Sequence, residues 1–440
     1  MLKIIPIGGY REVGKNCTVV QVDDEMIILD MGLHIENYIR YTEDEDVIKA
    51  DPRELIKAKA LPDTSFLEKN REKIKGIFVS HAHLDHIAAL PYLAGRFKCN
   101  IYGTRFSIEV LKAILKDDNI NLPNKLISHA VNSKMVVSDK ISVEFIKIAH
   151  SCPQTSMLAV HTPYGIVLYS NDFKFDKTPT LGKKSNIKRL MELRGKIKAL
   201  IVDSLYADTP HKTASEAIAK ELLEEVLLNS DTEKKAVIVT TFSSHLARLK
   251  SIVECSRKMK RKPVFLGRSL AKYTHAGKQA NIIDFEDDIE IIKYSKKVKK
   301  FLKNLKNPEK YLLVMTGNQG EPKAILARVV FEKWFDFSPG DFVVFSCSTI
   351  PTETNKENRK RLERALKIKR ARIFTDVHVS GHASREDHRD LIKMIRPEIL
   401  LPSHSDFETS KEFAELAEEE GYKEGKNVFV LENKKELILK

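Results

Sequence analysis

The sequence HAHLDH at 81–86 concentrates metal-binding groups in one short loop. It directly follows a short apolar run that predicts a β-strand, so the loop lies at the carboxyl end of that strand. Imidazole nitrogens and carboxylate oxygens are favoured ligands of Zn²⁺. Four such groups so close together cannot all reach one tetrahedral ion, so we expect two ions to share the loop. His81 and His83 would face one ion, and Asp85 and His86 the other.

The loop needs further ligands, and the chain offers three, each at the end of another predicted strand. They are His150, Asp172 and His404. Any one of them alone is more often a structural or surface group, but together they supply what the loop lacks. Asp172 is the better bridge between two ions, because a carboxylate has two oxygens to share.

This ligand set predicts hydrolysis of a phosphodiester. Two divalent cations about 3.5–4 Å apart can lower the pKa of a shared water molecule and stabilise both oxygens in a displacement at phosphorus. Asp30 ends an apolar strand at 26–30, and we expect its carboxylate to orient the histidine loop from behind the ligands. A role as a helix or turn cap is the alternative for Asp30.

A second group of residues could supply an acid. The peptide at 380–382 precedes a predicted helix with Ser384 as its N-cap, where free N–H groups favour an anion. A phosphate held there would lie beside His382, which could protonate the leaving oxygen or stabilise its charge. Asp203 ends a strand that begins at residue 199 and could orient His382. A turn carboxylate is the alternative for Asp203.

Strands position these groups in the first part of the chain. Apolar and alternating runs predict strands at 3–7, 17–22, 26–30, 76–80, 157–161, 165–170 and 199–202, with further strand candidates across 134–148. The pattern changes near residue 213, where Thr213 and Glu216 have the spacing of a capping box. The helix predicted behind Thr213 carries on one face Ile218, Leu222, Val226 and Leu227.

Strands and helices then alternate in the middle of the chain. The strands are predicted at 236–240, 263–267, 311–315, 341–347 and 371–375. Such alternation predicts a parallel α/β unit with crossover helices. The Lys-rich stretch at 293–306 is typical of a solvated helix face.

The last segment returns to the residue types of a metal site. It contains HVSGH at 378–382, a predicted helix at 385–395, a strand at 399–401 and then His404. The strands and metal-ligand residue types of the first part of the chain are thus interrupted by an alternating α/β segment and then resume. This order predicts one domain with another inserted into it.

Composition narrows the class of protein. The chain has 440 residues and a net charge of +13, which favours a polyanionic partner, although a Lys- and Glu-rich surface of a heat-adapted organism is the alternative. Its five cysteines are widely spaced, without a C-x-x-C pair, which favours reduced thiols in a cytoplasm. No apolar run approaches the roughly 18 residues that span a bilayer, and no secretory signal is evident. We therefore expect a cytoplasmic protein with no membrane association.

Several long segments resemble the metallo-β-lactamase fold nucleases that carry a β-CASP insert, and among them the ribonuclease J family in its shorter archaeal form. These segments are IGGYREVGKN (7–16), IKGIFVSHAHLDHIAALPYL (74–93), FLGRSL (265–270), TGNQGEP (316–322), FSCSTIP (345–351) and HVSGHAS (378–384). Together with the ligand set, the resemblance covers nearly the whole chain.

The resemblance implies a fold and a metal complement. It implies an α/β protein with a four-layer αββα nuclease domain at 1–205 and 376–440 and a β-CASP domain at 206–375. It implies two Zn²⁺ per chain, with Mn²⁺ as the alternative metal, and Asp172 as the bridge. One ion would be held by His81, His83 and His150, and the other by Asp85, His86 and His404.

The resemblance also implies a substrate and its contacts. Family members thread single-stranded RNA through a cleft between the two domains, which implies an RNA partner with a 5′-monophosphate. The catalytic residues would be Asp85, Asp203 and His382. The substrate contacts would be His378, Val379, Ser380, Gly381 and His382 in the phosphate loop, and Gly267, Arg268, Ser269, Ser346 and Ser348 in the insert.

The leading functional hypothesis is therefore a zinc-dependent 5′-to-3′ exoribonuclease, with some endonuclease activity, in RNA decay and maturation. Three alternatives stay open: a purely endonucleolytic enzyme, a small-molecule hydrolase on the same scaffold, and a non-catalytic RNA-binding protein. The long insert and the basic charge count against the small-molecule hydrolase, and the intact ligand set counts against the non-catalytic protein. A homodimer stays open.

Overall fold

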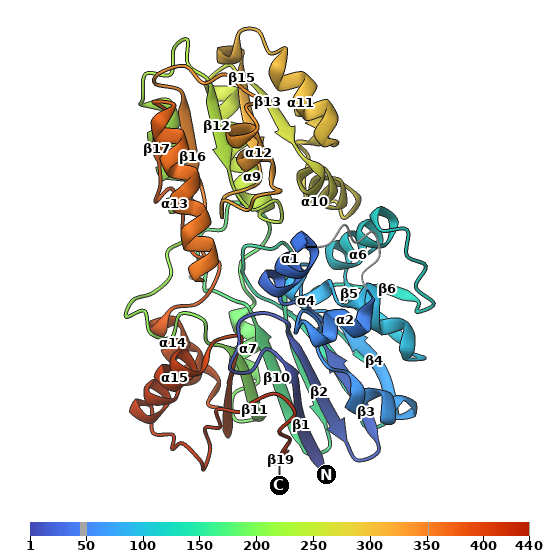
Figure 1. The fold of residues 1–440 in the computed structure, drawn as a ribbon. Helices are drawn as coiled ribbons and strands as arrows, with labels where there is room; N and C mark the ends of the chain where they lie inside the picture. The colour runs from blue at the N-terminus through green and yellow to red at the C-terminus, as the bar shows by residue number, and fades with distance from the viewer. Residues whose placement is uncertain (45–50, 351, 440) are drawn as a thin grey trace. The chain divides into compact units, whose positions relative to one another are not determined.

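A computed structural model describes residues 1–44, 51–350 and 352–439, so Pro351 of the FSCSTIP segment lies outside the described residues. The chain forms two compact units (Figure 1). The first unit comprises 1–175, 184–213 and 381–440, and the second comprises 176–183 and 214–380. The second unit therefore interrupts the first along the sequence, as the return of the metal-site residue types predicts.

The first unit contains two β-sheets. One has the strand order β19-β1-β2-β3-β4-β5-β6, formed by β1 (Leu2–Gly8), β2 (Cys17–Val22), β3 (Glu25–Leu29), β4 (Ile74–Phe78), β5 (Asn100–Thr104), β6 (Leu126–His129) and β19 (Leu437–Leu439). The other has the order β18-β11-β10-β9-β8-β7, formed by β7 (Ser133–Val136), β8 (Ser142–Lys147), β9 (Ser156–Thr162), β10 (Gly165–Asn171), β11 (Ile197–Asp203) and β18 (Ile399–Ser403).

The two sheets of the first unit pack face to face. Alternate residues of β9 show why: Leu158 and Val160 join a core that includes Ile27 and Phe78 of the other sheet, whereas Met157 points to the opposite face. That opposite face packs against α7 (Ile187–Glu192), α14 (Arg385–Ile395) and α15 (Phe407–Glu419). On the other side of the unit, α6 (Arg105–Asp117) contacts β5 and β6. The layers are therefore αββα, and the fold expectation is confirmed (Figure 1).

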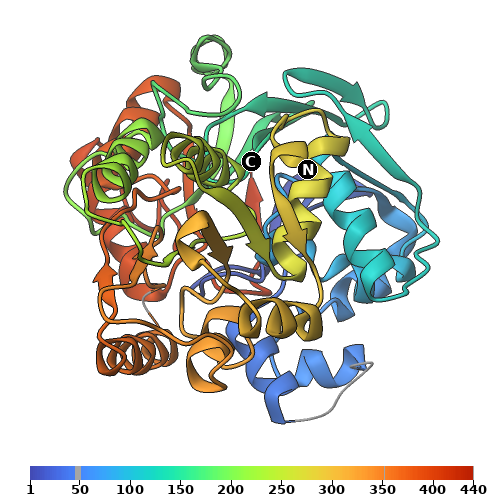
Figure 2. The same cartoon turned by 90° about the horizontal axis from the view of Figure 1, so that it is seen from above.

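The second unit is built on one parallel sheet with the order β14-β13-β15-β12-β16-β17. Its strands are β12 (Val237–Thr240), β13 (Lys262–Leu266), β14 (Glu290–Ile292), β15 (Tyr311–Met315), β16 (Phe342–Phe345) and β17 (Arg372–Phe374). Its helices, which flank the sheet in Figure 2, are α8 (Glu216–Leu228), α9 (Leu246–Lys258), α10 (Arg268–Gln279), α11 (Ser295–Lys303), α12 (Ile325–Phe331) and α13 (Glu353–Ile368). The alternating pattern predicted this parallel unit correctly but missed the short strand β14.

One helix start and one helix face were predicted wrongly. Helix α8 begins after Ser215, whose side chain accepts the backbone N–H of Ala217, and not after Thr213. The carboxylate of Glu216 pairs with Arg248 instead of turning back to a cap. Burying that ion pair fixes the inward face of α8, so Ala219, Leu223 and Leu227 are buried, and Ile218 and Leu222 are exposed.

The other predicted helix start is correct. Helix α14 begins after Ser384, and a complete capping box joins Ser384 to Asp387. This places the start of α14 next to Gly381 and His382 in the chain.

Candidate metal centre

All the predicted ligands lie at carboxyl ends of strands in the first unit. The HAHLDH loop follows β4, and Asp30 follows β3, which is parallel to β4. In the second sheet β8, β10, β11 and β18 run in one direction. His150, Asp172 and His404 come after β8, β10 and β18, and Asp203 is the last residue of β11. Because these strand ends meet at one edge, residues far apart in sequence come together.

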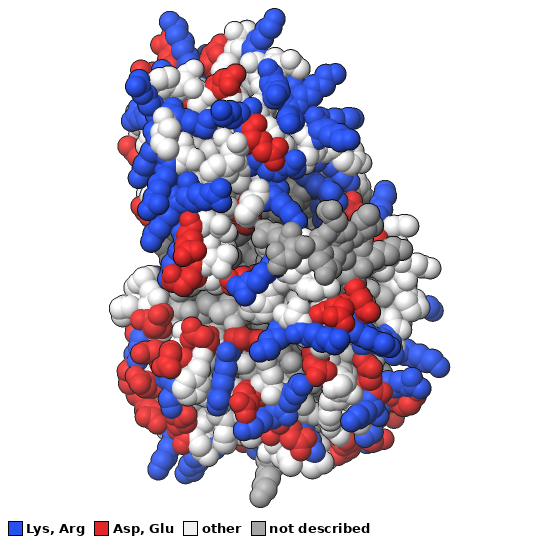
Figure 3. Space-filling model, in the orientation of Figure 1, with Lys and Arg blue, Asp and Glu red and all other residues white. Residues whose placement is uncertain are grey.

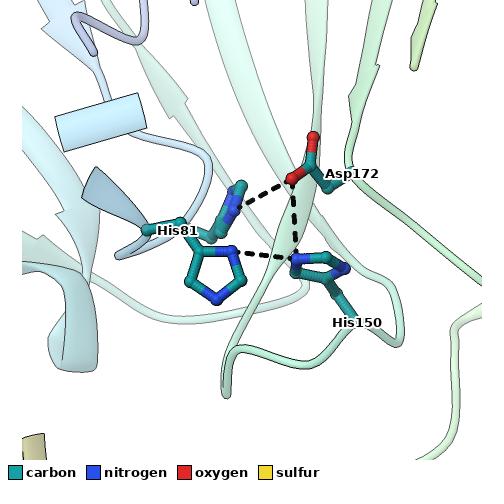
Figure 4. Close-up of side chains that lie close together, drawn as sticks. His81, His150 and Asp172 are labelled. Carbon is teal, nitrogen blue, oxygen red and sulfur yellow. Dashed lines mark hydrogen bonds and ion pairs between the residues drawn. The ribbon is translucent and has the colours of Figure 1, made fainter. Parts of the chain in front are cut away.

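Asp172 lies at the centre of the cluster, and its two oxygens face different imidazoles. Its Oδ2 lies 3.5 Å from His81 Nε2 and 3.6 Å from His150 Nε2 (Figure 4). Its Oδ1 lies 3.3 Å from His86 Nε2 and 4.0 Å from His404 Nε2. This is the arrangement of a carboxylate that bridges two cations.

The predicted ligands form two groups that share Asp172, and a third group of metal-binding side chains joins Asp172 and His404 to Asp203 and His382. Within each of the first two groups the ligand atoms lie within 4.8 Å of one another: His81, His83, His150 and Asp172 in one, and Asp85, His86, Asp172 and His404 in the other. His81 Nε2 and Asp172 Oδ1 are buried without a hydrogen-bond partner among the described residues. Buried polar atoms of this kind carry a penalty unless something satisfies them, so this donor set fits divalent cations.

Asp30 holds the histidine loop from behind. Its Oδ2 accepts from His86 Nδ1 at 2.7 Å, from the Ser80 hydroxyl at 2.6 Å and from the Tyr169 hydroxyl at 3.0 Å. The same Ser80 hydroxyl lies 3.0 Å from His81 Nδ1. With each Nδ1 held in this way, both imidazoles turn Nε2 toward the centre of the cluster, as the orienting role expected of Asp30 requires.

Gly381 holds a third imidazole. Its carbonyl accepts from His150 Nδ1 at 2.7 Å, so His150 Nε2 also faces the centre. A Cβ at Gly381 would lie 2.9 Å from the side chain of Ser151, which explains why glycine is needed here. The predicted substrate contact of Gly381 stays a prediction, and the structure adds that its carbonyl orients a ligand.

Sequence reasoning missed Asn16. Its Nδ2 lies 2.9 Å from His86 Nε2 and 2.8 Å from His404 Nδ1, and it donates to the Asp85 carbonyl at 3.1 Å. Asn16 ends the IGGYREVGKN segment, but an amide among the metal ligands gives no spacing signal, so only the folded geometry reveals it.

His382 lies beside the ligands with Asp203 behind it. Asp203 Oδ2 accepts from His382 Nδ1 at 2.8 Å, and His382 Nε2 lies 4.0 Å from Asp172 Oδ2. Burial alone lowers the pKa of His382, but the carboxylates of Asp203 and Asp172 outweigh burial and raise that pKa to about 9. These two carboxylates therefore favour the protonated imidazolium, whose Nε2–H would face the ligand cluster.

The pKa values of the ligand histidines shift in two directions. Burial, reinforced by neighbouring imidazoles, lowers the pKa of His83 and of His150 well below the ordinary value. For His86 burial also lowers the pKa, but the carboxylates of Asp172 and Asp85 outweigh it and the pKa rises. A metal ligand must be deprotonated when it binds a cation. The imidazoles with a lowered pKa already are, so they can bind divalent cations without releasing a proton.

The substrate contacts predicted in the insert lie in the second unit. Arg268 and Ser269 are exposed at the start of α10, behind Gly267, whose φ of 128° favours glycine. Ser348 is exposed. Ser346 is buried: its hydroxyl donates to the Val377 carbonyl and accepts from Arg248. Its hydroxyl therefore takes part in an internal hydrogen-bond network of the second unit, and the predicted contact with the substrate stays a prediction.

The predicted phosphate loop is divided between the units. His378, Val379 and Ser380 belong to the second unit, and Gly381 and His382 belong to the first. The contacts within the first unit therefore support only the Gly381 and His382 end of this loop.

Comparisons with protein families place three models along the chain. The metallo-β-lactamase superfamily matches 10–186, the β-CASP domain of ribonuclease J matches 234–362, and the Zn-dependent metallo-hydrolase RNA specificity domain matches 369–431. The β-CASP match lies within the second unit, and the RNA specificity match begins near the end of that unit and continues into the first.

Similar proteins cover the chain from end to end. Ribonuclease J of Methanocaldococcus jannaschii is 40% identical over 437 residues, which are 98% of this chain and 97% of that protein. Ribonuclease J of Pyrococcus abyssi is 42% identical over 438 residues, which are 98% of this chain and 96% of that protein. The chain belongs to the ribonuclease J family. As a ribonuclease J family member it is a metal-dependent enzyme that hydrolyses RNA.

Other matches are less similar to this ribonuclease J family member. Ribonuclease J of Synechocystis is 31% identical over 440 residues, which are 98% of this chain and 64% of that protein. A solved structure from Enterococcus faecalis V583, described as a protein of unknown function, matches with a TM-score of 0.68 over both complete chains at 17% identity. That likeness concerns the fold alone. Among the described residues, no helix has the length and apolar character needed to cross a membrane.

Proposed function

We propose that this chain is a zinc-dependent ribonuclease that degrades single-stranded RNA mainly in the 5′-to-3′ direction, in RNA decay and maturation. The observation that carries the proposal is the placement of Asp172, whose two oxygens face two separate groups of imidazoles. A His-rich donor set favours Zn²⁺, with Mn²⁺ as the alternative metal.

One cation would be held by His81, His83 and His150, and the other by Asp85, His86 and His404, with Asp172 shared. Bound there, the pair would supply Lewis acidity and a water molecule of lowered pKa for attack at phosphorus. Asp30, Ser80 and the Gly381 carbonyl keep the ligating nitrogens aimed at the centre.

His382 has the geometry of the general acid. Its protonated ring points Nε2–H toward the cluster, while Asp203 holds Nδ1 and favours the imidazolium. Transfer of that proton to the 3′ oxygen would let the leaving nucleotide depart without an unfavourable alkoxide. Asp203 is fully buried and accepts the Leu205 N–H at 2.9 Å, so it keeps the ring in place.

The finer features of the proposal follow the family resemblance. For the substrate, they are a preference for a 5′-monophosphate and contacts to the 5′ end from Arg268, Ser269 and Ser348. For the chain, they are a nuclease domain at 1–205 and 376–440 around a β-CASP domain at 206–375. We also propose a cytoplasmic location, and a homodimer stays open. The exposure of the three contact side chains is compatible with that role.

RNA labelled at one end tests the proposal. Substrates with a 5′-monophosphate, a 5′-triphosphate or a 5′-hydroxyl are incubated with the metal-loaded protein, and the products are resolved by length. We expect stepwise release of mononucleotides, fastest from the monophosphate. Internal cuts alone would instead favour the endonuclease, and His81→Ala that leaves hydrolysis unchanged would refute the metal centre as the active site.

A further inference from the structure

The second unit contains a groove that the catalytic proposal does not use. It has a volume of about 920 Å³ and is bounded by the end of β14, by α11 and by the segment that leads into β15. All of its lining residues lie between 291 and 311, within the Lys-rich stretch and its flanks. The groove is therefore a local feature of the second unit.

The groove is strongly basic. Five lysines line it, namely Lys293, Lys297, Lys300, Lys306 and Lys310, and none of the described lining residues is acidic. In the part of the chain that the structure describes, Lys297, Lys300, Lys306 and Lys310 form no ion pair with a carboxylate. Figure 3 shows Lys and Arg side chains gathered over this part of the surface. On two other helices of the second unit, α9 and α13, most lysines form an ion pair with a carboxylate, for example Lys258 with Glu224.

The fold presents these lysines on one side of α11. Val298 and Leu302 are buried in the core of the second unit, so the helix is anchored by its apolar face. Lys297 and Lys300, one turn apart, then line the groove, whereas Lys296 and Lys299 are exposed and do not line it. The lysines of α11 therefore divide into two that line the groove, Lys297 and Lys300, and three that do not, Lys296, Lys299 and Lys303.

Aromatic rings lie among the groove lysines. Tyr294, the N-cap residue of α11, is 57% exposed, which is unusual for so large a ring. Phe301 and Tyr311 also line the groove, with their ring centroids 6.0 Å apart in an edge-to-face arrangement. Asn304 and Asn307 add hydrogen-bonding groups. Phe301 and Tyr311 also pack against the core of the second unit, so Tyr294 is the ring that a solvated helix face would not need.

We propose that this groove binds single-stranded RNA at a site separate from the metal centre. Lys297, Lys300, Lys306 and Lys310, which form no ion pair among the described residues, match a phosphate backbone. The exposed ring of Tyr294 can stack on an unpaired base without regard to sequence. A duplex hides its bases and would gain only the charge contacts. The choice of RNA as the polyanion rests on the proposed ribonuclease function, whereas the groove itself rests on its lining residues.

Two variants with equal charge changes test the charge contacts. The test variant carries Lys297→Glu and Lys300→Glu, and the control carries Lys296→Glu and Lys299→Glu, at the same spacing on the same helix. Both are placed in a His382→Ala background of the full metal-loaded chain, so that RNA survives the measurement. Fluorescence anisotropy with a 30-nucleotide uridine RNA gives the affinity over a series of salt concentrations.

We expect the test variant to bind about tenfold or more weakly, and its slope of log affinity against log salt to be shallower by about 1.4, since each phosphate contact to a single strand contributes about 0.7. The control should keep the parental slope. Equal losses in the two variants, or none in either, would overturn the groove assignment. Thermal unfolding of both proteins checks that α11 is intact.

A third variant tests the stacking contact. Tyr294→Ala should weaken binding of the single strand by about tenfold, the usual scale for one stacked base, and leave binding of a 30-base-pair duplex unchanged. An equal effect on both nucleic acids would contradict base stacking.

The groove and the catalytic proposal can fail separately. If the protein with native His382 hydrolyses RNA but the test variant binds like its control, the groove assignment fails and the ribonuclease stands. If RNA binds with the predicted lysine dependence but no hydrolysis occurs, the groove stands and the catalytic proposal fails.

Discussion

At the metal centre, hydrogen bonds divide the roles of the two nitrogens of each imidazole. His86, His81 and His150 hold Nδ1 against a carboxylate, a hydroxyl and a carbonyl, and each presents Nε2 to Asp172. The ring orientation is thus set before any cation arrives, which lowers the cost of binding one. His382 is held in the same way by Asp203, which favours its protonated form.

The role of His382 can be tested by removing its imidazole. His382→Ala should lower turnover by roughly 10²–10⁴, the usual contribution of a general acid. His382 lies outside the two ligand groups assigned to the cations and shares a third group with Asp172, Asp203 and His404. If the assignment to two groups holds, metal content should stay the same. Steady-state hydrolysis of RNA and elemental analysis check the two outcomes. Loss of metal together with activity would make His382 a ligand.

Asn16 is a positioning residue on the other side of the centre. Its amide holds Nδ1 of His404 and the backbone carbonyl of Asp85, and these two residues belong to one ligand group. Asn16→Ala should weaken metal affinity about 10- to 100-fold, as loss of an orienting partner usually does. Metal titration followed by calorimetry measures this directly. Asn229→Ala, whose exposed side chain bonds only Glu225 among the described residues, is the control and should bind metal normally.

At the scale of elements, buried polar groups fix the packing positions of two helices. Helix α8 is fixed by Glu216, which accepts from both Nε and Nη2 of Arg248, at 2.7 Å and 2.9 Å. Helix α14 is fixed by its capping box at one end and by His388, which packs against the rings of Phe173 and Phe413. Both groups are buried, so replacing them tests the packing of a single helix.

Breaking the buried pair on α8 should be costly. Arg248 is fully buried, and burial raises the pKa of Glu216, but His245 and Arg248 outweigh it and hold that pKa well below its usual range. Glu216→Gln leaves the guanidinium without its counter-charge and should lower the free energy of unfolding by about 3–5 kcal/mol. Denaturant unfolding measures this. Replacing both residues by leucine should cost less than Glu216→Gln, and a larger cost would contradict the account.

His388 predicts a pH dependence of stability. Burial lowers its pKa from the ordinary 6.5 to about 4. Between these values the unfolded chain binds a proton at this residue and the folded chain does not, so stability falls as the pH drops from about 7 toward 4. The loss should reach about 3 kcal/mol, since one pKa unit corresponds to about 1.36 kcal/mol.

The comparison variant for this pH effect is His388→Phe, which keeps a ring among Phe173 and Phe413. Its free energy of unfolding should fall less steeply over the same pH range. Parallel curves for the two proteins would mean that other groups cause the acid sensitivity.

At the scale of the whole molecule, the metal centre draws on segments spread over most of the first unit. The ligands of one cation alone come from residue 81 to residue 172, and the other group extends to His404. Cations bound there would tie β4, β10 and β18 together. Metal binding should therefore stabilise the fold as well as supply the chemistry.

Chelation tests this coupling. Removing divalent metal should abolish RNA hydrolysis and lower the free energy of unfolding by about 2.7 kcal/mol relative to protein with free metal at 100-fold above its dissociation constant. Thermal unfolding and RNA hydrolysis are followed as Zn²⁺ or Mn²⁺ is returned. A chelated protein that keeps full activity would contradict a metal-dependent active site.

The sequence by itself determined the parallel sheet of the insert and the start of α14, because apolar periodicity and capping residues act locally. The αββα class came instead from the resemblance of whole segments to a known family. The metal-ligand residue types, each after a predicted strand, also indicated which side chains would meet. Helix α8 shows the limit: Thr213 and Ser215 are both suitable caps, and only the distant Arg248 decides between them by pairing with Glu216.

The tertiary structure decided what depends on contacts between distant residues. It placed an amide at Asn16 between two ligands, used the Gly381 carbonyl to orient His150, and buried the Ser346 hydroxyl in a structural network. It also divided the lysines of α11 into those that line a groove with aromatic rings and those that do not. None of these features leaves a spacing pattern, because each arises from a partner far away in the chain.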